Sequence, residues 1–475
     1  MLSTQFKLAL SAISVAVLAG CVNYAGIHAK GKLDTPRDIP SEAVLGAHAP
    51  AAVDWPRDNW WERFEDPQLN QLIQDALASN PDIAEVQARM DRATAFMDYA
   101  QADRFPTVDA GAGISRSRLA RSDDYAGLGN RYLTLRSLDV QFGYNFDLWG
   151  GKRAAWESAL DRAAAAKVDV QSARLNLSAS VAKAYNQLTF SWALLDLSER
   201  DLDRLEKMLT LSKQRYRLGL DNQSQLKLVE GLRNRASAQA IEAKNDIEIS
   251  KLQLAALSGK GLDRALDIKR PGKMSPYVDG LPVNLPADLL GRRPDIVAAR
   301  LRVEAELKNT DAVKADFYPN INLVTSVGIH SLLGDSFFDS VSKFWRIAPA
   351  VTLPIFDAGR LRASLRTSNA DLDIAIAQYN KTLNTAFHDV GSSMTQVRSL
   401  SGQVSEQEKA RISTFESFTL AHERYNMGQD SFLDYLNAER QLISDETQLA
   451  LLRSRQVDAS ISLLVALGGG FVATH

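Results

Sequence analysis

The residues of this chain that could carry catalytic chemistry are few and scattered. The six histidines stand far apart, and no His-Glu-x-x-His motif or Cys/His cluster offers a set of metal ligands. No glycine-rich loop ends in Lys-Ser or Lys-Thr, so a phosphate-binding loop for ATP is absent from the sequence. His388 and Asp389 are neighbours on an expected helix and are interpreted as structural, and the glycines at 468–470 as a flexible terminus. The sequence therefore indicates no enzyme and no cofactor.

Cys21 is the one residue whose setting indicates a covalent modification. Residues 8–18 form an apolar run that is too short to span a bilayer, and the run ends in Leu-Ala-Gly-Cys at 18–21. These four residues resemble the bacterial lipobox, so we expect a signal peptide at 1–20 and lipid on Cys21. The alternative is an ordinary signal peptide with an incidental cysteine. Position 22 is Val rather than Asp, the residue that retains many lipoproteins in the inner membrane, so the resemblance indicates the outer membrane.

Charge and hydropathy exclude two further classes of protein. The formal net charge of -2 argues against a nucleic-acid-binding protein, which would carry a basic surplus. No later stretch has 18 consecutive apolar residues, so no transmembrane helix is expected after the signal peptide. A chain of this kind can span a membrane only with strands that close into a barrel.

The sequence contains an internal duplication. Pro81-Asp82-Ile83 recurs as Pro294-Asp295-Ile296, and the Arg-Tyr pair at 215–216 recurs at 424–425, so the offsets are 213 (294 − 81) and 209 (424 − 215). The expected division is a lipidated linker at 21–58, a first repeat at 59–258, an equatorial segment at 259–283, a second repeat at 284–470 and a tail at 471–475.

Each repeat predicts helices of unusual length. Residues 107–270 and 355–475 contain no proline, and residues 152–218 contain no glycine either. A continuous helix over that last run would be roughly 100 Å long. Shorter helices are expected at 84–104 and 297–317. Helices this long are typical of coiled coils and helical tubes.

Two strands are expected in each repeat, at about 107–118 and 133–149 and at about 320–330 and 344–356. In the second strand apolar residues such as Leu138 and Val140 alternate with Asp139 and Gln141. About ten residues of this alternation are typical of an outer-membrane strand. The alternative is a soluble sandwich edge with one wet face. Four strands cannot close a barrel, which needs about eight, so several copies of the chain must share one.

Several segments resemble the TolC-like outer membrane factor family, and in particular its OprM/NodT branch of lipoproteins. They are Trp60-Trp61 with Phe64 and Asp66-Pro67-Gln68-Leu69, the segment Leu285–Arg292 continued by Arg293-Pro294-Asp295-Ile296, Phe317-Tyr318-Pro319, Pro354-Ile355-Phe356-Asp357, and Ala466-Leu467-Gly468. The resemblance covers nearly everything after about residue 55.

That resemblance implies an α+β membrane protein that works as a homotrimer. Four strands per chain would form a shared transmembrane β-barrel, which continues into a long periplasmic α-helical barrel with a small equatorial region. The implied function is the passive outer-membrane channel of a tripartite (RND-type) efflux system for drugs, toxic organics or metal ions. Its implied partners are a periplasmic adaptor (membrane fusion) protein, an inner-membrane transporter and outer-membrane lipid, and no nucleic acid.

The two glycine turns are the first candidates for a functional site. By resemblance they form the periplasmic mouth and contact the adaptor, with Gly219, Gly428, Arg215 and Arg424 as the candidate residues. The structural alternative is that each glycine ends a helix with positive φ, after which Asp221 or Asp430 caps the next helix.

Asp434 is the sharper candidate, because the resemblance places it where family members carry an acidic ring at the periplasmic entrance. Asp430, four residues earlier, is expected on the same helical face. Position 437 is Asn where family members often have a second Asp, which argues against a double ring. Tyr425 and Tyr216 are expected to supply closing hydrogen bonds. The alternative for Asp434 is an ordinary solvated helix face.

Three other functions remain open from the sequence. The same architecture could serve a type I protein secretion system, although the lipobox and the segment at 285–296 favour efflux. A lipid-anchored periplasmic coiled-coil scaffold would need no apolar-faced strands, and an anchored enzyme has no candidate site.

Overall fold

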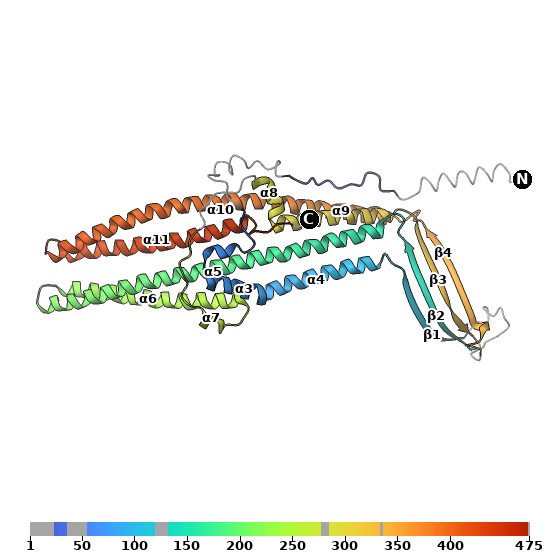
Figure 1. The fold of residues 1–475 in the computed structure, drawn as a ribbon, viewed down its shortest axis with the longest axis horizontal. Helices are drawn as coiled ribbons and strands as arrows, with labels where there is room; N and C mark the ends of the chain where they lie inside the picture. The colour runs from blue at the N-terminus through green and yellow to red at the C-terminus, as the bar shows by residue number, and fades with distance from the viewer. Residues whose placement is uncertain (1–22, 36–54, 119–131, 277–284, 333–335, 474–475) are drawn as a thin grey trace. The chain divides into compact units, whose positions relative to one another are not determined.

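The computed structural model describes residues 23–35, 55–118, 132–276, 285–332 and 336–473, with the element labels of Figure 1. The first half contains η2 (Trp60–Phe64), α3 (Pro67–Ser79), α4 (Pro81–Ala102), β1 (Thr107–Arg118), β2 (Tyr132–Phe146), α5 (Gly151–Arg217), α6 (Gln223–Ser258) and α7 (Arg264–Asp267). The second half contains α8 (Leu285–Arg292), α9 (Pro294–Ala315), β3 (Asn320–Ser331), η4 (Ser340–Ser342), β4 (Lys343–Thr352), α10 (Arg360–Asn426) and α11 (Phe432–Ala466).

The element lengths of the two halves agree closely. Helices α4 and α9 have 22 residues each, α5 and α10 have 67 each, and α6 and α11 have 36 and 35. Both α4 and α9 begin at the proline itself, three residues earlier than expected, because proline is well suited to the first position of a helix. Matching lengths are the expected result of a duplicated sequence.

The chain is divided into two compact units, and each draws on both halves. Unit 1 comprises residues 1–33, 91–165 and 299–379, and unit 2 comprises residues 34–90, 166–298 and 380–475. Helices α4, α5, α9 and α10 therefore contribute residues to both units. The repeats divide the sequence, whereas the units group residues that pack together.

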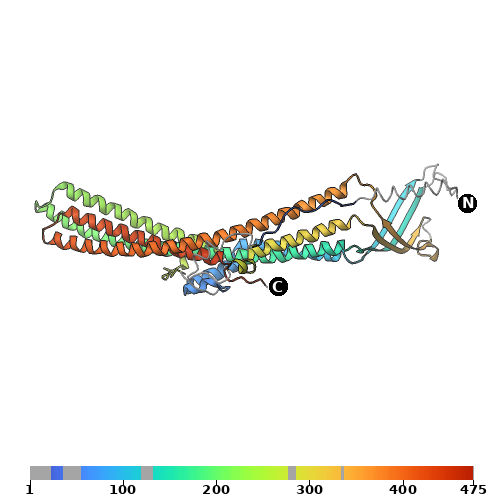
Figure 2. The same cartoon turned by 90° about the horizontal axis from the view of Figure 1, so that it is seen from above.

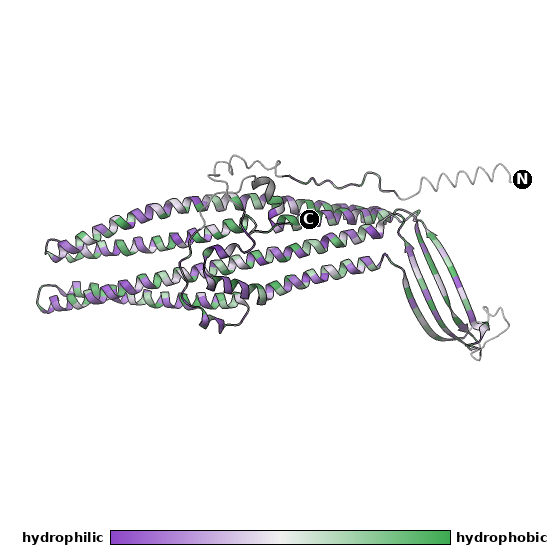
Figure 3. Cartoon of the chain, in the orientation of Figure 1, coloured by the Kyte–Doolittle hydropathy of each residue, from purple (hydrophilic) through white to green (hydrophobic). Residues whose placement is uncertain are grey.

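Unit 1 contains a four-stranded antiparallel sheet in the order β1-β2-β3-β4 (Figure 1). Residues directly opposite one another share a face of the sheet, so each row across the strands belongs to one face. One row is apolar and consists of Ala110, Val140, Val327 and Trp345. The adjacent row is polar and consists of Asp109, Gln141, Ser326 and Arg346. The pairing register therefore places the predicted apolar and polar residues in separate rows across the four strands, and Figure 3 shows the resulting bands.

Two of the strands end earlier than the sequence pattern predicts. Strand β2 stops at Phe146 rather than 149, because the Asp147 carboxylate accepts the backbone N–H of Lys152 at 3.0 Å and draws the chain into α5. Strand β4 stops at Thr352 rather than 356.

The N-terminal strap, residues 23–33, belongs to unit 1 and runs against α10. One carboxylate oxygen of Asp373 accepts two successive backbone N–H groups, those of residues 30–31, at 2.8 and 2.6 Å. The hydroxyl of Tyr24 lies 3.0 Å from that of Tyr318, just before β3. This docking could not be predicted from the sequence, because it depends on residues more than 290 positions apart.

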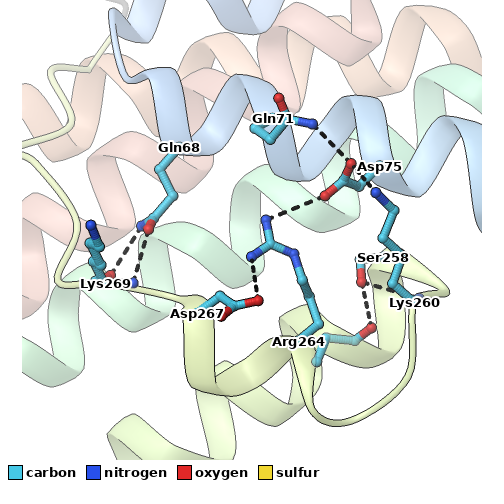
Figure 4. A network of polar contacts seen from close by, with 9 residues as sticks. Gln68, Gln71, Asp75, Ser258, Lys260, Arg264, Asp267 and Lys269 are labelled. Atoms are coloured by element: carbon cyan, nitrogen blue, oxygen red, sulfur yellow. Dashed lines mark hydrogen bonds and ion pairs between the residues drawn. The ribbon is translucent and has the colours of Figure 1, made fainter.

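In unit 2 the segment after α6 is fastened to α3 by a buried carboxylate (Figure 4). Asp75 is 5% exposed and accepts from Lys260 at 2.6 Å, Arg264 at 3.3 Å and Gln71 at 2.9 Å. Burial acts to raise the pKa of Asp75, but the hydrogen bonds and the charges of its basic partners outweigh it and leave the pKa below the usual value. A paired carboxylate of this kind tolerates burial.

The glycines at 468–470 are not the flexible terminus that the sequence suggested. All three have positive φ, between +58° and +90°, and two of them are buried. A Cβ on Gly468 would overlap the carbonyl oxygen of Arg292, and one on Gly470 would overlap the backbone of Arg57. The run is glycine because the backbone turns where other backbone segments leave no room for a side chain.

Arg293, the residue after Arg292, fixes the end of α11 to the rest of unit 2. Arg293 is 8% exposed, and its side chain donates to both oxygens of Asp295 (3.0 and 2.7 Å), to the carbonyl of Ala466 (3.2 Å) and to Asp389 (3.4 Å). The interpretation of Asp389 as a structural residue therefore agrees with its contact.

The parts of four helices that lie in unit 2 pack around one apolar core, and Figure 2 shows them side by side. They form two hairpins, α5–α6 and α10–α11. The core residues are Leu205 and Met208 of α5, Val229 and Ala236 of α6, and Tyr435 and Leu436 of α11, with Phe418 and Tyr425 of α10 against them.

Candidate functional site

The two turns that close these hairpins have the same backbone geometry. Gly219 and Gly428 adopt φ of +72° and +73°, in the left-handed region that favours glycine. In the first turn the N–H of Gly219 donates to the carbonyl of Tyr216 at 3.0 Å. The N–H of Leu220 then donates to the carbonyl of Arg215 at 2.9 Å, and the second turn repeats both bonds. Each glycine therefore ends its helix in a Schellman motif, as the structural reading of the sequence expected.

An arginine–aspartate pair spans each turn. Arg215 donates through Nε to both oxygens of Asp221, at 3.0 and 3.1 Å, and Arg424 donates through Nε to Asp430 at 3.0 Å. The hydrogen bond to Asp221, with a smaller contribution from the phenol of Tyr425, holds the pKa of Arg215 above its usual value. Both predicted adaptor-contact arginines thus use part of their donor capacity within their own turn.

The prediction that Asp221 and Asp430 cap the following helices is wrong. The N-cap of α6 is Asn222 and that of α11 is Ser431, and each forms a capping box. In α11 the hydroxyl of Ser431 accepts the backbone N–H of Asp434, and the Asp434 carboxylate accepts the backbone N–H of Ser431, both at 3.3 Å. The two aspartates lie one residue before the caps, where they face the arginines instead.

Asp434 is exposed, but Asp430 does not share a helical face with it. Helix α11 begins at Phe432, so Asp430 precedes the helix and the expected spacing of four has no meaning there. The Asp434 carboxylate also accepts the hydroxyl of Ser431, which lies 2.6 Å from Oδ2. The capping box therefore accounts for the position of this side chain. A capping role and a role at the entrance are compatible, since the side chain remains accessible to solvent.

The two candidate tyrosines differ in their surroundings. Tyr425 stacks on Tyr435 at 5.6 Å between ring centroids and lies 5.7 Å from Phe432. Tyr216, its counterpart in the first repeat, is 42% exposed. The closing hydrogen bonds expected of both tyrosines stay a prediction.

In the ranges that the structure describes, no group of three or more His, Cys, Asp or Glu side chains is placed to hold a metal ion. None of the described helices combines the length and the apolar character needed to cross a membrane. Cys21, the predicted lipidation site, lies outside the described residues.

Sequence reasoning missed two charged pairs of unit 2 in which one partner is buried. One joins Arg293 to Asp389, and the other joins Arg204 of α5 to Glu439 of α11. Arg293 stands in the segment that carries the family resemblance, which was a usable signal. Arg204 and Glu439 are ordinary charged residues of long helices, and nothing in the sequence distinguishes them.

The comparisons with known proteins agree on one family. Residues 72–260 and 285–469 match the family model described as outer membrane efflux protein. The chain is 33% identical to the fusaric acid resistance protein FusA of Burkholderia cepacia, over 78% of this chain and 70% of that protein. It is 30% identical to the multidrug resistance outer membrane protein MdtP of Escherichia coli, over 89% and 88% of the two chains.

A solved structure gives the same result for the fold. The outer membrane protein VceC of Vibrio cholerae is 33% identical and superposes with a TM-score of 0.82, covering 88% of this chain and 100% of that chain. The family expected from the segment at 285–296 is thereby confirmed, together with the fold class. The chain belongs to the outer membrane efflux protein family.

Proposed function

We propose that three copies of this chain form the passive outer-membrane exit duct of a tripartite efflux system. The observation that carries the proposal is the sheet of unit 1. Its register sets a complete apolar row beside a complete polar row, which suits a wall with lipid on one side and water on the other.

The same sheet supports pooling among copies. Among the described residues β1 pairs only with β2, and β4 pairs only with β3, so each chain has two open edges. Open edges do not persist in hydrocarbon because their backbone groups find no partners there. Since antiparallel pairing alternates along the sheet, β4 of one copy can continue onto β1 of the next. Three copies would supply twelve strands, the number that the family resemblance implies.

The cargo we propose is a small toxic organic molecule. FusA is named for fusaric acid resistance and MdtP for multidrug resistance, and both match most of this chain. In a passive duct the energy for export would come from the partners rather than from this chain.

Two partners and a lipid complete the proposal. A periplasmic adaptor would contact the two glycine turns, and an inner-membrane transporter would supply the energy. Lipid on Cys21 would anchor the chain in the outer membrane. The strap supports this last point, since Tyr24 lies against Tyr318 just before β3, close to the sheet that would enter the membrane.

We also propose that Asp434 lines the entrance of the duct and attracts cations there. Its exposure and its place next to the second turn support that role. Tyr425, which stacks on Tyr435 of α11 beside the second turn, is the tyrosine we propose for a closing contact there.

Two neighbouring residues of β3 test the function directly. Val327 belongs to the apolar row and is 57% exposed in the single chain, whereas Ser326 belongs to the polar row. A Lys on a lipid-facing position costs about 2–4 kcal/mol at the bilayer midplane, while a water-facing position accepts it. In a strain that lacks the gene, Val327→Lys should fail to restore efflux of a fluorescent dye, and Ser326→Lys should restore it. Equal efflux by the two variants would overturn the proposal.

A further inference from the structure

The contact between α5 and α11, which we call the seam, contains a buried carboxylate with one oxygen that accepts no hydrogen bond from the described residues. Glu439 is 2% exposed, and its Oε1 lies 3.3 Å from Nε of Arg204. Neither of these two atoms forms a hydrogen bond with any described residue. Buried polar groups are normally hydrogen-bonded, so a carboxylate in this setting calls for a physical explanation.

Helix α5 brings one positive and one negative charge to Glu439. Arg204 is the cation, and its Nη2 lies 4.0 Å from the carboxylate of Asp201, one turn away on the same helix. The guanidinium is therefore shared between two carboxylates. Burial raises the pKa of Asp201, and the charge of Arg204 only partly offsets it.

The other helices contribute aromatic and apolar groups. On α11 itself Tyr435 stands one turn before Glu439, and burial followed by the charge of Glu439 raises the pKa of Tyr435 to about 12. Helix α10 brings His422, whose ring centroid lies 5.4 Å from that of Tyr435. Helix α6 brings Val229 and Ala236 to the same core, while its Arg233 pairs with Glu206 of α5.

These surroundings make Glu439 sensitive to protons. Burial is the largest influence and raises its pKa, Arg204 lowers it, and the charge of Asp201 raises it again, so that the pKa lies above the usual value of 4.5. A seam that separates would expose the carboxylate to water and return its pKa to the usual range. Protonation therefore favours the packed seam, and ionisation as the pH rises favours the hydrated, separated one.

We propose that Glu439 is a proton-operated release between the hairpins α5–α6 and α10–α11, which stay packed while it is neutral and separate when it is ionised. The proposal rests on the function proposed above, because separation of the hairpins would widen the entrance of the duct next to their turns. The half-buried Arg204 does not prevent this, since the cost of desolvating an ionised Glu439 offsets much of its attraction to the guanidinium.

The chain contains a matched control pair on the same seam. Arg200 Nη2 donates to Glu446 Oε2 at 3.4 Å, and the two side chains are 61% and 18% exposed, against 29% and 2% for Arg204 and Glu439. A change at Glu446 removes one charge from the seam without changing a buried group of the kind found at Glu439.

The experiment measures conductance of the reconstituted full-length protein in planar bilayers between pH 4.5 and 8. The wild-type protein should conduct poorly in acid and better above a midpoint. Glu439→Gln, which keeps the shape and cannot ionise, should lose this step and stay in the poorly conducting state. Glu446→Gln should keep the wild-type midpoint. Arg204→Gln removes the cation and should move the midpoint upward by about one pH unit or more.

A step that persists unchanged in Glu439→Gln would overturn the inference. Hydrogen exchange of the segments around residues 204 and 439, corrected for the intrinsic effect of pH, gives a readout that does not depend on conductance. Exchange there should accelerate with pH in the wild type and not in Glu439→Gln. Absence of conductance in every protein, with the exchange pattern intact, would count against the duct and not against the release. Size-exclusion chromatography in detergent establishes that each variant is folded.

Discussion

The guanidinium of Arg215 donates through Nε to both carboxylate oxygens of Asp221, at 3.0 and 3.1 Å, and thereby closes the first hairpin turn over Gly219. Arg424 and Asp430 repeat the arrangement over Gly428. The duplicated sequence has therefore kept one complete turn in both halves: helix end, glycine, ion pair and capping box. A surface that recognises the first turn would meet nearly the same backbone at the second.

Replacing the glycine of the second turn should loosen that turn. A side chain at Gly428 meets no atom within 4 Å, so the cost of Gly428→Ala comes only from its φ of +73°, about 1–2 kcal/mol. Hydrogen exchange of the amides near the turn should accelerate roughly 5- to 30-fold. Gly231→Ala, in the interior of α6 and equally open, is the control and should slow exchange nearby. Equal behaviour of the two variants would show that the left-handed backbone is not required.

Asp434 allows its charge to be separated from its capping function. Gln at the third position of a helix also completes a capping box, so Asp434→Gln should keep α11 intact while it removes the carboxylate. The preference of the reconstituted channel for cations over anions should fall, because a repeated ring of charge at the entrance would be lost. The measurement is the reversal potential in a salt gradient. An unchanged reversal potential would remove Asp434 from the entrance.

Much of the fold could be predicted because the signals are periodic and local. The alternation around Val140 fixes which side chains share a face, and the shared register of four strands then follows. Gly219 and Gly428 predict the two turns because only glycine readily takes a backbone conformation with positive φ. Repetition of both patterns at nearly constant offset revealed the duplication.

The remainder depends on contacts between distant segments or on a choice between adjacent residues. Asp221 and Asn222 are both good helix caps, and the sequence does not reveal that Arg215 engages the first and leaves the second for the helix. The pairing of Arg204 with Glu439 requires two helices 235 positions apart (439 − 204) to pack in one register. The glycine run at 468–470 needed the neighbouring backbone of Arg292 to explain it.

The strap should come loose when Asp373 is removed. Its carboxylate accepts two backbone N–H groups of the strap, and hydrogen bonds to a charged group contribute about 1.5–3 kcal/mol. Asp373→Ala should therefore speed tryptic cleavage near Lys30 about tenfold or more. Asp371→Ala, an exposed position two residues earlier on α10, is the control. Cleavage at the same rate in both variants would mean that the strap is held elsewhere.

Asp458 should make the protein less stable as the pH rises. Burial raises the pKa of Asp458 although the Asn186 amide, 2.9 Å away, acts in the opposite direction. The neutral carboxyl is therefore accommodated in acid, and the penalty appears as the pH passes the raised pKa. Asp458→Asn should raise the thermal midpoint at pH 8 and change it little near pH 3.5. A gain of equal size at both pH values would contradict this account of the site.

The central claim is that the four-stranded sheet of one chain closes a pore only when it is pooled among copies. The most direct measurement is the number of chains in the detergent-extracted particle, obtained by light scattering coupled to size-exclusion chromatography and corrected for bound detergent. The account predicts three. A particle that contains a single chain and still conducts ions in a bilayer would contradict it.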